Sequence, residues 1–109
     1  MNDKYILNYI LNGHTPVVEP DLMKWAQWFE TADRHVVRDK VGDKEVSTVF
    51  LGLDYSFDYL GKAKPIFFET MIFNEKGEAE DDWRYCTWEE AEAGHKKIVE
   101  ELKSKVEQS

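Results

Sequence analysis

Residues 35–53 read His35-Val-Val-Arg-Asp-Lys-Val-Gly-Asp-Lys-Glu-Val-Ser-Thr-Val-Phe-Leu-Gly-Leu53. Gly42-Asp43 has turn chemistry, because glycine adopts positive φ without strain. Side chains alternate along residues 35–41, with Val37, Asp39 and Val41 on one face and Arg38 and Lys40 on the other. Residues 45–53 are apolar on both faces, which is typical of a central strand. The stretch therefore predicts a β-hairpin within an antiparallel sheet.

The chain upstream of this hairpin predicts a shorter hairpin and a helix. Asn12-Gly13 favours a tight turn between strands near 5–11 and 14–18. Pro20-Asp21 opens a helix over 21–32, with Asp21 as its cap. An apolar stripe recurs there at three- and four-residue spacing, formed by Leu22, Trp25, Phe29 and Ala32.

The chain downstream predicts two more strands and a long helix. Residues 65–73 form a strand, residues 75–82 an acidic turn and residues 83–86 a short last strand. Thr87-Trp-Glu-Glu90 is a capping box, in which the threonine and glutamate side chains satisfy free backbone N–H groups of the first turn. The helix that it starts runs to about residue 106 and carries His95 on its apolar stripe.

These elements together predict one α+β domain over residues 1–109. We expect an antiparallel, meander-like β-sheet of about five or six strands, packed by two α-helices.

The charge of the chain restricts its partners. Lys and Arg number 14 against 22 Asp and Glu, so the net charge is −8. Proteins that bind DNA or RNA neutralise phosphates with Lys and Arg, so we expect no direct nucleic-acid partner. The same charge favours a protein partner with a basic surface.

The setting is predicted from what the sequence lacks. Cys86 is the single cysteine and has no internal disulfide partner, which favours a reducing compartment. No apolar run approaches the roughly 20 residues of a membrane span. We therefore expect a cytoplasmic protein with no membrane contact.

Motifs for catalysis are absent from the sequence. It has no glycine-rich phosphate loop, no nucleophile elbow and no paired Cys-x-x-Cys. His14, His35 and His95 share no short ligand spacing of the kind that zinc sites use. We expect no metal and no cofactor, and the sequence favours a protein that is not an enzyme.

Two segments are candidates for binding a partner. The first is the aromatic loop, with Tyr55, Phe57, Asp58 and Tyr59, and the second is the acidic turn, with Glu78, Glu80, Asp81 and Asp82. Loop aromatics either cover the core or form a contact patch, since aromatic residues are enriched at binding hot spots. The acidic turn is either a solvated connection or the face offered to a basic partner.

A candidate pocket is suggested by charged residues in or beside apolar strands: Arg34, His35, Arg38, Asp54 and Glu69. A carboxylate among core residues is costly unless it is paired or hydrogen-bonded. Glu69 is therefore either a general base or metal ligand, acting with His35 and Asp54, or the structural partner of Arg34 or Arg38. In the structural interpretation, which we favour, Asp54 caps the turn that leaves its strand.

Four segments, 28–36, 46–54, 67–73 and 85–95, together resemble a family of small proteins encoded by tailed bacteriophages and prophages. They read Trp28-Phe-Glu-Thr-Ala-Asp-Arg-His-Val36, Val46-Ser-Thr-Val-Phe-Leu-Gly-Leu-Asp54, Phe67-Phe-Glu-Thr-Met-Ile-Phe73 and Tyr85-Cys-Thr-Trp-Glu-Glu-Ala-Glu-Ala-Gly-His95. The resemblance covers roughly residues 5–100 and implies a phage origin, and with it the cytoplasm of a host cell as the setting, without implying a mechanism. The family pattern has a histidine followed by a glycine-rich stretch at the position of Tyr55, and this chain departs from the pattern there.

Three functions remain open at this point. The first, which we favour, is stoichiometric binding to a host protein or defence complex. The second is a nucleotide-like small-molecule binder, or a small enzyme, with its pocket near Glu69. The third is a minor structural protein of the phage particle. Whether the chain forms a homo-oligomer in that role is left undecided by the sequence.

Overall fold

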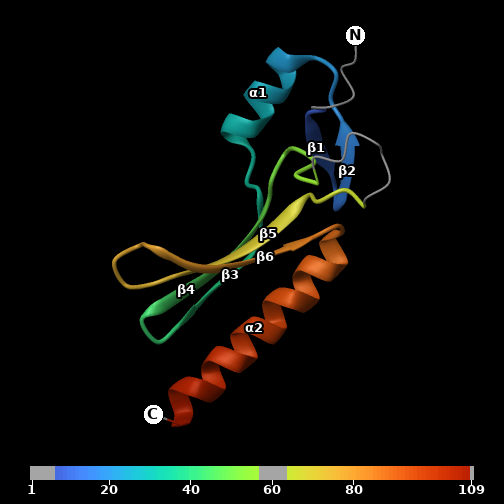
Figure 1. Ribbon diagram of the computed structural model, residues 1–109. Coiled ribbons are helices and arrows are strands. Elements are labelled where there is room, and N and C mark those ends of the chain that lie inside the picture. Colours follow the sequence, from blue (N-terminus) through green and yellow to red (C-terminus); the bar gives the residue numbers. More distant parts are fainter. Residues whose placement is uncertain (1–6, 57–63, 109) are drawn as a thin grey trace.

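The computed structural model describes residues 7–56 and 64–108 and has an α+β fold (Figure 1). The elements in chain order are β1 (Tyr9–Asn12), β2 (Thr15–Val18), α1 (Leu22–Thr31), β3 (His35–Val41), β4 (Lys44–Phe50), β5 (Phe68–Phe73), β6 (Ala79–Tyr85) and α2 (Trp88–Gln108). Two antiparallel sheets and two helices confirm the predicted fold class.

The main sheet is a four-stranded meander in the order β3-β4-β5-β6. The hairpin predicted from residues 35–53 forms its first two strands, with Gly42 at a φ of 60° in the turn. The described sheet has fewer strands than the five or six expected, because β1 and β2 pair with each other. One bridge, between Asn8 and Leu53, connects that small hairpin to the chain leaving β4.

Helix α2 covers one face of the main sheet (Figure 1). The core between them contains Val46, Phe50, Phe68 and Ile72 from the strands and Ala91, Ile98 and Val99 from the helix. The predicted capping box is confirmed at the start of α2. Glu90 N donates to Thr87 Oγ1 at 3.1 Å, and Thr87 N donates to Glu90 Oε1 at 3.2 Å.

Helix α1 and the β1–β2 hairpin lie at one end of the main sheet (Figure 1). The Trp28 ring meets Phe50 edge-on, and Trp25 Nε1 donates to Tyr9 O at 3.0 Å. The predicted apolar stripe is only partly used, since Leu22 is 61% exposed. The reason is geometric: α1 packs against the end of the sheet rather than its face, so its first turn projects beyond the core.

The acidic stretch is largely a strand and not the turn that we predicted over 75–82. The turn occupies Asn74–Gly77, and β6 begins at Ala79. Asp and Glu are poor strand formers. Pairing with β5 overrides that preference, because the side chains from Ala79 to Arg84 are exposed and their charges stay hydrated.

Candidate functional site

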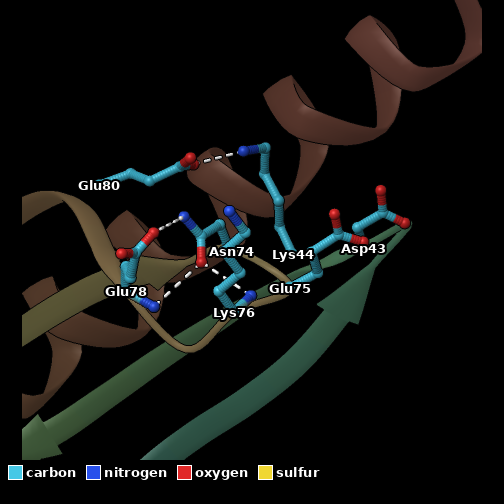
Figure 2. A pocket seen from close by; sticks show the side chains of 7 residues that line it. All are labelled: Asp43, Lys44, Asn74, Glu75, Lys76, Glu78 and Glu80. Atoms are coloured by element: carbon cyan, nitrogen blue, oxygen red, sulfur yellow. Dashed lines mark hydrogen bonds and ion pairs between the residues drawn. The ribbon is translucent and has the colours of Figure 1, made fainter.

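An acidic hollow lies where the β3–β4 and β5–β6 turns meet (Figure 2). Its volume is about 290 Å³, and it is lined by Asp43, Lys44, Asn74, Glu75, Lys76, Glu78 and Glu80. We call these seven residues the acidic hollow. Four carboxylates face two lysines there, so the hollow carries a net negative charge that a cationic group would neutralise.

The β5–β6 turn is held in shape by Asn74. Its Oδ1 accepts from Lys76 N at 2.9 Å and from Glu78 N at 3.0 Å. Its Nδ2 donates to Glu78 Oε1 at 3.0 Å. Gly77, at a φ of 82°, supplies the positive φ that the turn requires. Lys44 Nζ pairs with Glu80 across the two hairpins, which fixes the width of the hollow.

The predicted acidic residues divide between the hollow and the adjoining strand. Glu78 and Glu80 line the hollow, while Asp81 and Asp82 continue along β6 away from it. Asp82 Oδ2 lies 3.8 Å from Arg84 Nε.

The structure describes only one of the four residues that we predicted in the aromatic loop. Tyr55 is half-buried at the opposite end of β6 from the hollow, with the Arg84 guanidinium 5.6 Å from its ring centroid. Phe57, Asp58 and Tyr59 lie outside the described residues. Arg84 thus lies beside both Tyr55 and Asp82, whereas Glu78 and Glu80 lie at the hollow, at the other end of β6.

Two residues of the candidate pocket make structural contacts with backbone. Arg34 Nη1 donates to Phe50 O at 2.9 Å, and its guanidinium lies 3.9 Å over the Phe29 ring. Asp54 Oδ1 accepts from Ser56 N and from Ile66 N, each at 2.9 Å. Asp54 thus ties together the two chain segments that flank the aromatic loop, in agreement with the capping interpretation.

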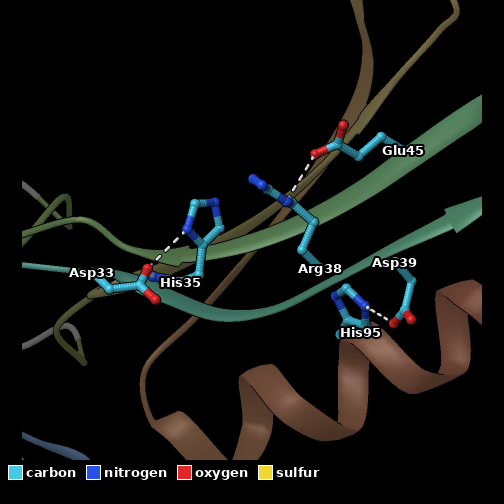
Figure 3. A network of polar contacts seen from close by, with 6 residues as sticks. All are labelled: Asp33, His35, Arg38, Asp39, Glu45 and His95. Carbon is cyan, nitrogen blue, oxygen red and sulfur yellow. Dashed lines mark hydrogen bonds and ion pairs between the residues drawn. The ribbon is translucent and has the colours of Figure 1, made fainter.

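His35 and Arg38, on edge strand β3, contact two different carboxylates (Figure 3). His35 Nδ1 lies 3.0 Å from Asp33 Oδ1, and Arg38 Nε lies 3.4 Å from Glu45 Oε2. Hydrogen bonds from the backbone N–H and side chain of His35 lower the pKa of the exposed Asp33 carboxyl.

Glu69 pairs with Arg84 of β6 at 3.3 Å, and not with Arg34 or Arg38 as the structural interpretation expected. The reason is the strand order: β4 separates β5 from β3, whereas Arg84 lies directly opposite Glu69. Burial raises the pKa of Glu69, and a hydrogen bond shared with Asp82 raises it further, while Arg84 opposes the rise. Glu69 lines none of the hollows described here.

A buried polar chain crosses the interface between α2 and the main sheet. His95 is 2% exposed, with Nε2 at 2.8 Å from Asp39 Oδ2 and Nδ1 at 2.7 Å from Thr48 Oγ1. Thr48 in turn is hydrogen-bonded to Thr70. A carboxylate only accepts, so Nε2 carries a proton; in a neutral ring Nδ1 then accepts from the Thr48 hydroxyl. Figure 3 shows Asp39 reaching the ring from β3, on the opposite side of that strand from Arg38.

The spacing along α2 predicts His95 on the apolar stripe but does not reveal its partners. One signal was present: the alternation in residues 35–41 puts Asp39 on the face of Val37 and Val41. An acid on an apolar face predicts a buried partner. The polar chain through His95 contains the residue types of a catalytic triad, namely a hydroxyl, an imidazole and a carboxylate. Its two hydroxyl residues, Thr48 and Thr70, are completely buried. No substrate reaches either hydroxyl, so the arrangement is structural.

A second hollow, of about 360 Å³, lies between the β1–β2 turn and the start of α2. His14 and Trp88 stack there with ring centroids 3.8 Å apart, and Phe67 and Cys86 also line it. Trp88 Nε1 is buried without a hydrogen-bond partner among the described residues.

Comparison with family models, curated proteins and solved structures gives no match for this chain. Within residues 7–56 and 64–108, no group of three or more His, Cys, Asp or Glu side chains is placed to hold a metal ion. None of the helices in that part of the chain is long and apolar enough to cross a membrane.

Proposed function

We propose that this chain is a small acidic accessory protein of phage type that binds stoichiometrically to a basic surface on a host protein or defence complex. The observation that carries the proposal is the acidic hollow, in which two hairpin turns present four carboxylates around one exposed concavity. The phage setting rests on the four segments quoted above.

The arrangement of charge favours binding over a purely solvated turn. A single exposed ion pair contributes only about 0–1 kcal/mol, so a useful electrostatic site needs several charges held together. Asn74 holds the Glu78 carboxylate and Lys44 holds that of Glu80 before a partner arrives, beside Asp43 and Glu75 in the same hollow. The net charge of −8 adds long-range attraction toward a basic surface.

The polar chemistry of the described residues also favours binding over catalysis. Among the described residues, one array joins a hydroxyl, an imidazole and a carboxylate. Its Thr48 and His95 are buried beneath α2, and only Asp39, whose side chain is 48% exposed, reaches the surface. On the open sheet face, Arg38 is paired with Glu45 and Arg84 with Glu69.

The experiment is capture of host-cell proteins by the tagged full chain, at about 50 mM and about 500 mM salt, where electrostatic screening differs strongly. We expect one basic host protein to be recovered at low salt and lost at high salt. Isothermal titration with that purified protein should then give a fixed stoichiometry. Recovery of no salt-sensitive partner would contradict the proposal.

A second candidate function is small-molecule binding at the hollow beside His14 and Trp88, not near Glu69. The hollow is within the size range of small-ligand sites and is lined mainly by apolar and aromatic side chains. A thermal-shift screen of nucleotides and planar aromatic compounds tests it. A ligand at about 100 times its Kd should stabilise the fold by about 2.7 kcal/mol, and Trp88→Leu should abolish that shift.

A further inference from the structure

The main sheet ends in two strands, β3 and β6, that have no neighbour on their outer sides within the described residues. Such edges present backbone N–H and C=O groups to which another strand can pair. Each edge strand has seven residues, which is long enough for a stable ladder.

The two edges carry opposite charge. On β3, the bases Arg38 and Lys40 accompany one acid, Asp39. On β6, Glu80, Asp81 and Asp82 accompany one base, Arg84. Two β6 edges would repel each other, and two β3 edges would lack complementary charge. A β3 edge and a β6 edge are complementary.

An exposed aromatic residue lies on the acidic edge. Trp83 is 37% exposed and pairs with Thr70, so its side chain shares the sheet face that α2 covers. On the opposite edge, the same face continues into a hollow of about 350 Å³ between β3 and α2. Val37 and Val99 supply apolar walls there, and Lys96 and Lys103 lie at its rim.

We propose that copies of this chain associate head to tail, with β6 of one copy pairing antiparallel to β3 of the next and Trp83 entering the hollow between β3 and α2. The meander makes this geometry simple. Successive strands alternate in direction, so a copy displaced along the sheet brings its β3 antiparallel to β6 with both helices on the same face.

The proposed contact uses different surfaces on the two partners, so it leaves a free β3 and a free β6 at the ends of every assembly. Such heterologous contacts give rings or open chains rather than closed two-fold dimers. Three carboxylates of the acidic hollow, those of Asp43, Glu75 and Glu78, lie at the strand turns and stay outside this contact, while the fourth, Glu80, belongs to β6.

Charged edge strands also occur as protection against aggregation. If the edge charges serve only to prevent aggregation, every contact between two edges should be repelled. Because β3 and β6 carry opposite signs, we expect instead that a β3 edge pairs selectively with a β6 edge. Charge-swap variants separate these two explanations.

The test is sedimentation velocity of the purified full chain from about 10 µM to about 1 mM, a range that brackets weak interfaces. We expect the weight-average mass to rise with concentration for the natural chain. Trp83→Ala should shift the half-association concentration upward by tenfold or more. A monomer at every concentration would overturn the proposal.

Two variants make the test specific. The first variant, Arg38→Glu/Lys40→Glu, makes the β3 edge acidic like β6. The second, Asp81→Lys/Asp82→Lys, makes the β6 edge basic like β3. Each variant alone should remain monomeric. Their mixture restores opposite charges at every junction and should associate again. Failure of the mixture to associate, when thermal unfolding shows both variants folded, would overturn the proposal. No host protein is present, so this result is independent of the proposed host binding.

Discussion

His95 on α2 and Asp39 on edge strand β3 are joined by a hydrogen bond of 2.8 Å between Nε2 and Oδ2. The other nitrogen of the same ring lies 2.7 Å from Thr48 on the central strand β4. One side chain therefore connects the helix to two strands, and the Thr48–Thr70 bond extends the connection to β5. A buried chain of this kind fixes the position of the helix, because a shift of either layer leaves polar atoms unpaired.

Replacing His95 with alanine should destabilise the fold by about 2–4 kcal/mol, since it removes buried volume and one of the two hydrogen bonds of the buried Thr48 hydroxyl. Urea unfolding measures the loss. Asp39→Asn is the control: its amide oxygen still accepts from Nε2, and we expect a loss below about 1 kcal/mol. Equal effects of the two variants would show that the carboxylate charge, and not the hydrogen-bond chain, is what matters.

Gly94→Ala should destabilise α2, although alanine is normally the better helix former by about 1 kcal/mol. A Cβ on residue 94 would lie 2.5 Å from the Tyr85 hydroxyl oxygen and would overlap the ring. Burial raises the pKa of that hydroxyl, which is consistent with a closely packed ring. Thermal unfolding of Gly94→Ala beside Lys97→Ala, an exposed position on the same helix, checks this. A stabilised Gly94→Ala protein would contradict the packing described here.

Glu69 should make stability fall as pH rises. Its folded-state pKa is raised, mainly by burial, so the folded state binds the proton more tightly than the unfolded state does. This contribution is fully present below the unfolded pKa and is lost as pH rises through the folded pKa. The unfolding free energy of the natural chain, relative to that of Glu69→Gln, should therefore fall as pH rises from below the ordinary glutamate pKa through the raised pKa of the folded state.

Asp82→Asn tests the second cause of that shift. Removing the Asp82 carboxyl should bring the pKa of Glu69 closer to its ordinary value, because Asp82 raises it. An NMR titration of the Glu69 carboxyl carbon measures the change directly. An unchanged midpoint would leave burial as the sole cause.

Local signals predicted most of the elements. The cap at Asp21, the Asn12-Gly13 turn, the Gly42-Asp43 turn and the capping box at Thr87 each involve neighbours in sequence. Their chemistry is decided within a few residues, so a single sequence suffices to locate them.

The polar contacts were harder to predict because they join distant segments. His95 is 56 residues from Asp39 and 47 from Thr48, and periodicity reveals only that it faces the core. The partner of Glu69 depends on strand order, which alternation within one strand does not contain. The exposure of Leu22 likewise depends on where α1 meets the sheet.

The central claim is that the acidic hollow binds a basic partner, and a charge-reversal comparison tests it most directly. Glu75→Lys/Glu78→Lys reverses two charges at the hollow, and Glu101→Lys/Glu107→Lys makes the same change in net charge on exposed positions of α2. All three tagged proteins are incubated with the same host lysate at low salt, and the recovered partner is quantified. The account predicts full recovery by the natural chain and substantial recovery by the α2 variant, with a loss of at least tenfold for the hollow variant. Equal recovery by the two variants would contradict it, because binding would then depend on overall charge and not on the hollow.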